Sequence, residues 1–405
     1  MRLGAPKEIY NQIMITKITV ESFKTLEKVE IKLGLVNVFV GANGSGKSNL
    51  LEAVGVLSAA ADGKVNDQVL LQRGVRPGLP QLYKSAFTER LPQHIFFGAQ
   101  NDNSSYDVAL HNPMNDAKPW RYKTESWMQG TKNLASRSPA MADNPNTEVG
   151  LAYARAIEMK PGSPGLNLLN QLRNFVVFSP TTPVLRGTAP ESQPRQPVGI
   201  HGGRLPDAVG ELLTLAKKNK RAAKVCEDAL RLIDWAKDFR CESADKVPLS
   251  AAAGSSPRVI RFVDRYMREG RNFLSGYDAS EGALYVLFLA VLGAHEGSPQ
   301  FCAVDNADHG LNPRLAQALF KHLCDWILNA SEPRQILLTA HSPQVLDGLP
   351  LQDERVRLFT VARTDAGRSV VRRVEVNDKL LAMAKQGWTL SRLWVMGHLG
   401  GMPHV

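Results

Sequence analysis

The sequence has few of the residues that would place it in several large protein classes. Its four cysteines form no Cys-x-x-Cys pair and have no neighbouring histidine pair, so neither a zinc site nor a disulfide framework is expected. No apolar run reaches the ~18 residues of a membrane helix, and the best candidate, residues 284–292, is far shorter. The N-terminus has no secretory signal pattern. We therefore expect a cytoplasmic protein that does not contact membranes.

Acidic side chains are also in short supply. The chain has 49 Lys and Arg residues against 39 Asp and Glu, which gives a formal charge of +10. An excess of this size favours a polyanionic partner such as DNA or RNA, although a mixed, solvated surface would give the same count. A basic run at residues 217–224 leaves the same two explanations open, and a solvated helix face is the commoner one.

A glycine-rich segment is the most informative part of what is present. It reads Gly41-Ala42-Asn43-Gly44-Ser45-Gly46-Lys47-Ser48, between a predicted strand at residues 36–40 and a predicted helix at 49–60. Glycines permit a tight turn whose N–H groups point at phosphate oxygens, and the helix N-terminus adds its positive dipole end. Lys47 would supply charge to the β- and γ-phosphates, and Ser48 a hydroxyl to Mg²⁺. The segment predicts a nucleoside triphosphate site formed by Asn43, Gly44, Ser45, Gly46, Lys47, Ser48 and Asn49.

Two stretches of α/β character flank a long insertion. Alternating residues predict strands at 13–20 and 29–33, ahead of the strand at 36–40. We expect residues 1–60 to form the N-terminal half of the core, 61–277 an inserted lobe, and 278–405 the C-terminal half. Within the lobe, residues 61–165 are rich in Gly, Pro, Asn and Ser and predict a sheet with long loops, and 207–239 predict one or two helices.

Three further motifs follow in a fixed order. Ser280-Glu281-Gly282 stands at the start of an apolar helix pattern. Phe301-Cys302-Ala303-Val304-Asp305 is an apolar strand that ends in an acid, which could hold Mg²⁺ through water. A second buried strand leads to Thr339-Ala340-His341-Ser342-Pro343. Each motif alone is weak, but their order is diagnostic.

Together these segments resemble the ABC-type ATPases of the SMC, RecF and OLD group. The chain is similar in particular to the stand-alone predicted AAA ATPases of bacteria, including ATPase subunits of phage-defence systems such as Septu and PARIS. Asp305, Gly310, Leu311 and Pro313 follow the group's Walker B pattern, and Ser280-Glu281-Gly282 resembles its signature. His341 resembles its switch histidine, and Lys24, after Phe23, its basic residue near the nucleotide.

The resemblance implies an α/β fold and a mode of action. The fold would be a P-loop NTPase of the ABC or SMC-head type, with an antiparallel β subdomain and a large inserted α/β-helical lobe. ATP and Mg²⁺ would be the cofactors, with Ser48 and Asp305 as metal ligands. The signature, formed by Ser280, Glu281 and Gly282, would face another chain's γ-phosphate, which implies a head-to-tail dimer or a higher oligomer. His341 would hydrogen-bond the γ-phosphate and report its loss.

One residue departs from the group's pattern. Asn306 stands where the group has the glutamate that acts as general base or positions water, and an amide cannot accept a proton at neutral pH. Asp308 is the nearest acid that could substitute. Loss of proton transfer costs about 10²–10⁴-fold in rate, so ATP hydrolysis is expected to be weak or regulated, and ATPase activity is left open. Asp305, Asn306, Asp308 and His341 are the candidate catalytic residues.

The sequence favours two functions. The first is a slowly hydrolysing ATPase that dimerises around ATP and acts as a switch on DNA or a partner effector, in phage defence or DNA repair. The alternative is a nucleotide-locked scaffold that sequesters or activates a separate nuclease or toxin. The chain itself has no room for a fused nuclease after His341, and His111-Asn112 lacks the companions of a metal site. A transporter subunit is disfavoured by Gly310-Leu311-Asn312-Pro313 and by the long insertion.

Overall fold

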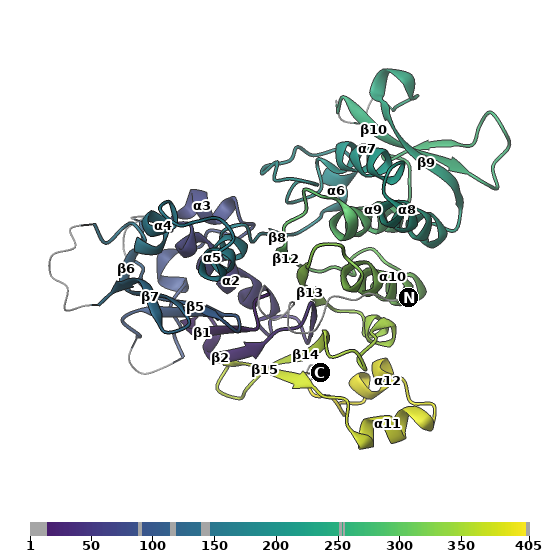
Figure 1. Ribbon diagram of the computed structural model, residues 1–405. Helices are drawn as coiled ribbons and strands as arrows, with labels where there is room; N and C mark the ends of the chain where they lie inside the picture. The colour runs from purple at the N-terminus through teal and green to yellow at the C-terminus, as the bar shows by residue number, and fades with distance from the viewer. Residues whose placement is uncertain are drawn as a thin grey trace.

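The molecule has three sheets, one in the core, one in a β subdomain and one in a helical lobe (Figure 1). The computed structural model describes residues 14–87, 91–113, 119–138, 146–250, 253 and 256–401. The first residue of the strand expected at 13–20 lies outside the described residues. In Figure 1 the β subdomain lies on the left, the helical lobe at the upper right and the C-terminal helices at the bottom.

The core sheet has the strand order β15-β14-β3-β13-β12-β8. All of its pairings are parallel except the edge pair of β14 and β15. Its strands are β3 (Val36–Val40), β8 (Val177–Phe178), β12 (Phe301–Val304), β13 (Gln335–Ala340), β14 (Val356–Arg363) and β15 (Ser369–Val374). Strands β3, β12 and β13 are buried along their whole length, which is why they are mostly apolar, and their polar residues Asn37, Gln335 and Thr339 are hydrogen-bonded. Both expected halves of the core thus meet in one sheet.

Alternate residues of β3 face two separate hydrophobic cores. Val38 packs in the core that contains α9 (Glu281–Ala294) and α10 (Pro313–Leu328), while Phe39 packs in the core that contains α2 (Lys47–Ala61) and α5 (Pro164–Arg173). Side chains alternate across a strand, so a two-sided sheet needs apolar residues at every position. The helix that follows the P-loop is therefore fixed by core packing along almost its full length.

A second sheet is antiparallel and has the order β2-β1-β4-β5-β6-β7. Its strands are β1 (Lys17–Phe23), β2 (Leu26–Lys32), β4 (Ile95–Gln100), β5 (Ser104–His111), β6 (Arg121–Gln129) and β7 (Lys132–Arg137), accompanied by α3 (Asp67–Leu71), α4 (Leu151–Ala156) and the 3₁₀ helix η1 (Pro80–Leu82). The antiparallel β subdomain and the sheet expected within residues 61–165 are present. Because β1 pairs with β4, this sheet crosses the boundary expected at residue 60.

The helical lobe carries the third sheet, in the order β11-β10-β9. Its elements are α6 (Thr182–Leu185), α7 (Leu205–Ala216), α8 (Lys220–Leu232), β9 (Ala236–Ser243), η2 (Ala244–Lys246), β10 (Arg258–Asp264) and β11 (Phe273–Ser275). The expectation of helix as far as residue 239 is wrong beyond residue 232. Ala236 and Phe239 are buried while their neighbours are more exposed, because β9 pairs along its length with β10.

The last described residues of the chain lie beside the P-loop. After η3 (Pro343–Gly348), β14 and β15 come α11 (Asp378–Lys385) and α12 (Leu390–Val395). The carbonyl of Gly401 then accepts a hydrogen bond of 3.2 Å from the backbone N–H of Ala42. No helix in the described ranges is long and apolar enough to cross a membrane.

Candidate nucleotide-binding site

The P-loop joins β3 to α2 and needs glycine at two positions with positive φ. Gly44 has φ 75° and open space around its Cα, whereas Gly46 has φ 109° and no room for a side chain. A Cβ at Gly46 would lie 2.2 Å from Ser369 Oγ and 2.9 Å from Thr25 Oγ1. L-residues avoid this backbone region, and here a side chain would also collide. Gly46 therefore fixes both the turn and its contact with β15.

The Lys47 side chain is folded onto the loop that carries it. Its Nζ donates hydrogen bonds of 2.7 Å to Gly41 O and 3.0 Å to Ala42 O. Burial lowers the pKa of Lys47 to about 8, against the opposing attraction of Asp305 and Asp308. The ammonium is thus held inside the loop, at the position from which it can serve phosphate oxygens.

A hydroxyl and a carboxylate meet at the start of α2. Ser48 Oγ donates to Asp305 Oδ2 at 2.9 Å, and Thr339 Oγ1 donates to Asp305 Oδ1 at 2.5 Å. Hydroxyl and carboxylate oxygens are the hard ligands that Mg²⁺ prefers. Ser45 Oγ is buried and has no hydrogen-bond partner among the described residues, which fits a loop built to receive further polar groups. The residues present fit a nucleotide with Mg²⁺.

Asn306 adopts a left-handed backbone conformation, with φ 53°. Asparagine tolerates this region better than glutamate does. Its backbone N–H donates to Thr339 Oγ1 at 2.8 Å, and its Oδ1 lies 2.9 Å from His341 Nε2. Burial and the neighbouring Lys47 lower the pKa of His341, so the imidazole is neutral at pH 7 and Nε2–H donates to the amide.

Asp308 holds the loop after β13 through one carboxylate oxygen, while its charge also acts on Lys47. Its Oδ2 accepts hydrogen bonds from the backbone N–H groups of His341, at 2.9 Å, and Ser342. Asp308 is itself buried. These contacts favour a positioning role for Asp308 over the catalytic role expected for it. The catalytic roles expected for Asn306 and Asp308 stay predictions.

Lys24 is tied to α2. Its Nζ forms an ion pair with Glu52, and Glu52 also accepts a hydrogen bond from Arg76 Nε at 2.8 Å. The Lys24 Nζ lies 5.4 Å from the centre of the Phe23 ring. Asn49 donates to Thr25 Oγ1 at 2.9 Å. Glu52 was not singled out from the sequence, although it is an acid within the largely apolar stretch of α2, where it is buried.

The signature residues lie at a different place, at the start of α9. Ser280 Oγ caps the helix by accepting from Ala283 N–H at 3.4 Å, and it also accepts from Trp235 Nε1 at 3.3 Å. Glu281 bonds to Thr182 and lies 3.4 Å from His309 Nδ1. A cavity of about 600 Å³ opens beside these residues, lined also by Gly282, Gly310 and Arg314 among others.

The structure therefore brings together one set of expected residues and leaves the other apart. Lys47, Ser48, Asp305, Asn306, Asp308 and His341 are linked by the hydrogen bonds and electrostatic contacts above. In the described part of the chain, no hydrogen bond or ion pair joins residues 280–282 to residues 43–49. Thr339 bridges Asp305 and Asn306. It belongs to the histidine motif, and no role was expected for it from the sequence.

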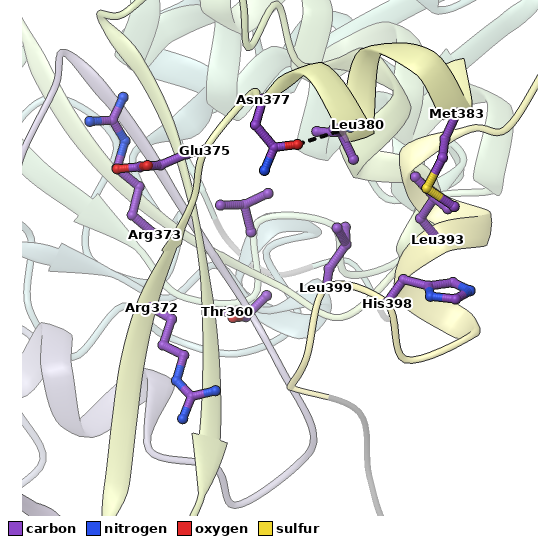
Figure 2. Close-up of a pocket in the computed structure, with 11 residues that line it drawn as sticks. Thr360, Arg372, Arg373, Glu375, Asn377, Leu380, Met383, Leu393, His398 and Leu399 are labelled. Carbon is purple, nitrogen blue, oxygen red and sulfur yellow. Dashed lines mark hydrogen bonds between the residues drawn. The ribbon is translucent and has the colours of Figure 1, made fainter. Parts of the chain in front are cut away.

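A further cavity, of about 320 Å³, lies between β15 and the segment that contains α11, α12 and His398 (Figure 2). Figure 2 shows Arg372 and Arg373 of β15 on one side, and Met383 of α11 with His398 on the other. The segment that lines it continues to Gly401, the residue that bonds the P-loop. Arg373 is already paired with Glu354 at 2.9 Å, so the cavity offers no concentrated positive charge.

Comparison with known proteins gives one family match. Residues 14–118 match the family model described as "AAA ATPase domain". No curated protein sequence matches the chain. The match covers β1 to β5 with the P-loop, and it stops short of the Walker B strand and the signature.

Among solved structures, three SMC head domains are similar to the chain. One is the SMC head domain from Thermotoga maritima, at 16% identity and a TM-score of 0.42, over 89% of this chain and 99% of that one. Another is an SMC head bound to the C-winged helix domain of ScpA, at 14% identity and a TM-score of 0.49, over 91% and 99%. The third is an SMC head with an extended coiled coil bound to the C-terminal domain of ScpA derived from Pyrococcus furiosus, at 12% and 0.49, over 92% and 99%.

All three TM-scores lie below 0.5, so the fold is assigned here from the strand order and the P-loop itself. The domain match supports an ATPase, and no similarity to phage-defence ATPases is shown. Residues 14–118 thus match an AAA ATPase domain, within an α/β fold that contains a P-loop.

Proposed function

We propose that the chain binds ATP with Mg²⁺, dimerises head-to-tail around it, hydrolyses it slowly, and acts as a switch on DNA or a partner effector. The observation that carries the nucleotide part is the pairing of Ser48 Oγ with Asp305 Oδ2 at 2.9 Å, beside the buried Lys47. The setting, in phage defence or DNA repair in the cytoplasm, belongs to the same proposal.

On ATP binding, the Lys47 ammonium exchanges the carbonyl oxygens of Gly41 and Ala42 for phosphate oxygens. Ser48 and Asp305 would hold Mg²⁺, which would neutralise phosphate charge. His341 keeps its Nε2–H directed at Asn306 and can redirect it to a phosphate oxygen. These residues bind and orient, and none of them needs to change protonation at pH 7.

The dimer part follows from the open signature edge. Ser280 stands at the N-terminus of a 14-residue helix, whose dipole favours an anion, yet no contact links it to the P-loop of the same chain. The adjoining cavity of about 600 Å³ is wide enough for another chain's loop to approach. A second copy that presents its bound phosphates would complete both sites.

Slow hydrolysis is supported by what faces the P-loop. Asn306 has no acidic side chain, and its amide oxygen is used by His341. Asp308 uses one oxygen on two backbone N–H groups. With no general base in place, turnover should lie about 10²–10⁴-fold below that of an enzyme that has one.

A second candidate is the nucleotide-locked scaffold, which would bind ATP and hold or release a separate nuclease or toxin with little hydrolysis. The hydrogen bond between Asn306 and His341 favours it, since it occupies the amide oxygen of Asn306. The two candidates differ in one measurable quantity, the rate of ATP turnover in the dimer.

A mixing experiment tests the shared site. Lys47→Ala removes the P-loop charge, and Ser280→Asp keeps the helix cap but places a negative charge where a partner's phosphate would bind. A heterodimer of the two variants contains one intact composite site. We expect ATP-dependent dimerisation, measured by light scattering, to be lost in each variant alone and restored in the mixture.

The controls follow from the same geometry. Ser280→Ala removes the cap hydroxyl without adding charge and should weaken dimerisation less than Ser280→Asp does. If each variant alone still dimerises with ATP, or if the mixture does no better than the two variants separately, the head-to-tail site is wrong.

A further inference from the structure

The turn between β10 and β11 in the helical lobe carries apolar, aromatic and cationic residues close together in the sequence. Residues 265–271 are all exposed. Tyr266 is 78% exposed, Met267 43% and Phe273 46%. We call residues 264–273 the hairpin turn. Three large apolar side chains within ten residues of one surface turn contribute little to folding, so they point to a ligand or partner.

The turn is built to hold these side chains in place. Asp264 Oδ1 accepts from the backbone N–H groups of Tyr266, at 2.7 Å, and Met267, at 2.9 Å. Asp264 N–H donates to Asn272 O at 2.8 Å, and Arg265 Nη2 donates to Ala236 O at 2.7 Å. The exposed aromatic groups are therefore carried by an ordered backbone, which lowers the entropy lost when they bind.

Positive charge dominates the same stretch. Between residues 258 and 275 the chain has five arginines against one aspartate and one glutamate, a net charge of +3. The Arg261 guanidinium lies 3.7 Å from the centre of the Phe273 ring. Arg268 and Arg271 are exposed, and neither forms an ion pair within the residues that the structure describes. Cations beside exposed rings suit a polyanion that also has flat faces to stack.

We propose that the hairpin turn binds single-stranded nucleic acid. Bases would stack on Tyr266, while Arg268 and Arg271 contact phosphates. A single strand fits better than a duplex because only unpaired bases expose the faces that an isolated aromatic side chain can cover. This inference rests on the proposed switch and names the surface through which it would act on DNA or RNA.

The hairpin turn is also joined to the signature. The backbone N–H of Arg265 donates to Trp235 O at 3.0 Å, the Trp235 ring lies 5.3 Å from that of Phe262 in β10, and its Nε1 donates to Ser280. One tryptophan thus contacts the nucleic-acid surface and the signature serine. A partner's phosphate at Ser280 would compete for the hydroxyl that Trp235 now uses.

The test is fluorescence anisotropy with the full chain, in the absence of nucleotide. The probe is a labelled single-stranded oligodeoxynucleotide of about 30 nucleotides, longer than the roughly 4–16 nucleotides of one binding site, with the same sequence as RNA and as a duplex. We expect Arg268→Ala with Arg271→Ala to weaken binding about tenfold and to lower the salt slope by roughly 1.4, near 0.7 for each phosphate lost. Tyr266→Ala should weaken binding by about fivefold or more, and Tyr266→Phe should restore it.

The matched control is Lys217→Ala with Lys218→Ala. These lysines are exposed in the same lobe, and their substitution removes the same charge as the arginine pair does. General electrostatic attraction therefore predicts an equal loss of probe affinity for both pairs. The inference predicts little change in the control. Circular dichroism and ATP binding should be unaltered in every variant, because none of these residues contacts the P-loop.

Several results would overturn the inference. They are the absence of wild-type binding to any probe, an equal loss in the lysine control, and a Tyr266→Ala variant that binds as wild type. Hairpin variants that alter the oligomeric state but not probe binding would assign the turn to a protein interface instead. Lys47→Ala separates the two proposals, since it should lose ATP yet bind the probe normally without nucleotide.

Discussion

The P-loop side and the signature side of the molecule differ in how complete they are. Lys47 is buried, and Ser48, Asp305 and Thr339 already satisfy one another. Ser280 stands at an open edge, and its neighbours Glu281 and Trp235 are only partly buried. The first site is formed by the core sheet and its helices, whereas the second is formed by the N-terminus of α9 and the segment that follows α8 in the lobe. The contrast separates a P-loop side whose polar groups are already paired from a signature side that stands at an exposed edge.

The largest expected effect tests whether the P-loop side lacks only a base. Asn306→Glu should raise ATP turnover by roughly 10²-fold, the low end of what a general base contributes. Steady-state phosphate release measures it. Asn306→Gln, equal in length but without a base, should give no rise. Because residue 306 has φ 53°, the Glu variant should also lose about 1 kcal/mol of unfolding free energy. Brisk wild-type turnover that Asn306→Glu does not increase would refute this account.

The second effect tests the buried lysine. Lys47→Ala should weaken ATP binding by roughly 10–150-fold, the equivalent of one charge-assisted hydrogen bond. Isothermal titration with Mg²⁺ and a non-hydrolysable analogue measures it. Lys64→Ala removes an exposed lysine just beyond the other end of α2 and should leave affinity unchanged. Normal binding by Lys47→Ala would remove the P-loop assignment.

The third effect is on pH dependence. The pKa of Lys47 is about 8 in the free chain, and bound phosphates raise it, so binding above pH 8 takes up a proton. ATP affinity should therefore fall as pH rises above 8, by at most about tenfold per pH unit. Equilibrium titrations between pH 7 and 9.5 measure this fall. Lys47→Ala should abolish it, and a wild-type affinity that stays constant over the range would contradict it.

The smallest effect concerns the signature edge. Trp235→Phe keeps a ring against Phe262 but removes the N–H that donates to Ser280. ATP-dependent dimer affinity should change by only about two- to tenfold, as for one neutral hydrogen bond. Sedimentation equilibrium measures it, and Trp388→Phe, which lies over Arg392 in the C-terminal region, is the control. An effect as large as that of Ser280→Asp would mean that Trp235 forms part of the interface.

Local sequence signals predicted the parts of the molecule that are fixed locally. The start of α10 is one such part, because Asn312 caps it and Pro313 occupies its first turn. The P-loop and its strand were equally clear, since glycine, lysine and serine are demanded by phosphate chemistry. Asp305 was placed by an apolar run that ends in an acid, and the structure brings it to Ser48.

Features that depend on distant partners were missed. The period of residues 207–239 indicated helix, but β10 recruits residues 236–243 as a strand through pairing that no local pattern records. The pairing of β1 with β4 likewise joins segments on both sides of the boundary expected at residue 60. Asp308 was expected only as a substitute catalytic acid. The fold alone shows that it accepts hydrogen bonds from the backbone N–H groups of residues 341 and 342.

The position of β3 in the core sheet has a consequence for biosynthesis. Its two neighbours are β13 (Gln335–Ala340) and β14 (Val356–Arg363), and Gln335 also hydrogen-bonds back to Ile15 O and Gly34 O. A ribosome adds about 5–20 residues per second, so the strand before the P-loop waits on the order of 15–60 s for its first lateral partner. The P-loop is thus translated well before the strands that flank β3, and a nascent chain should acquire ATP affinity only after β13 and β14 have been made.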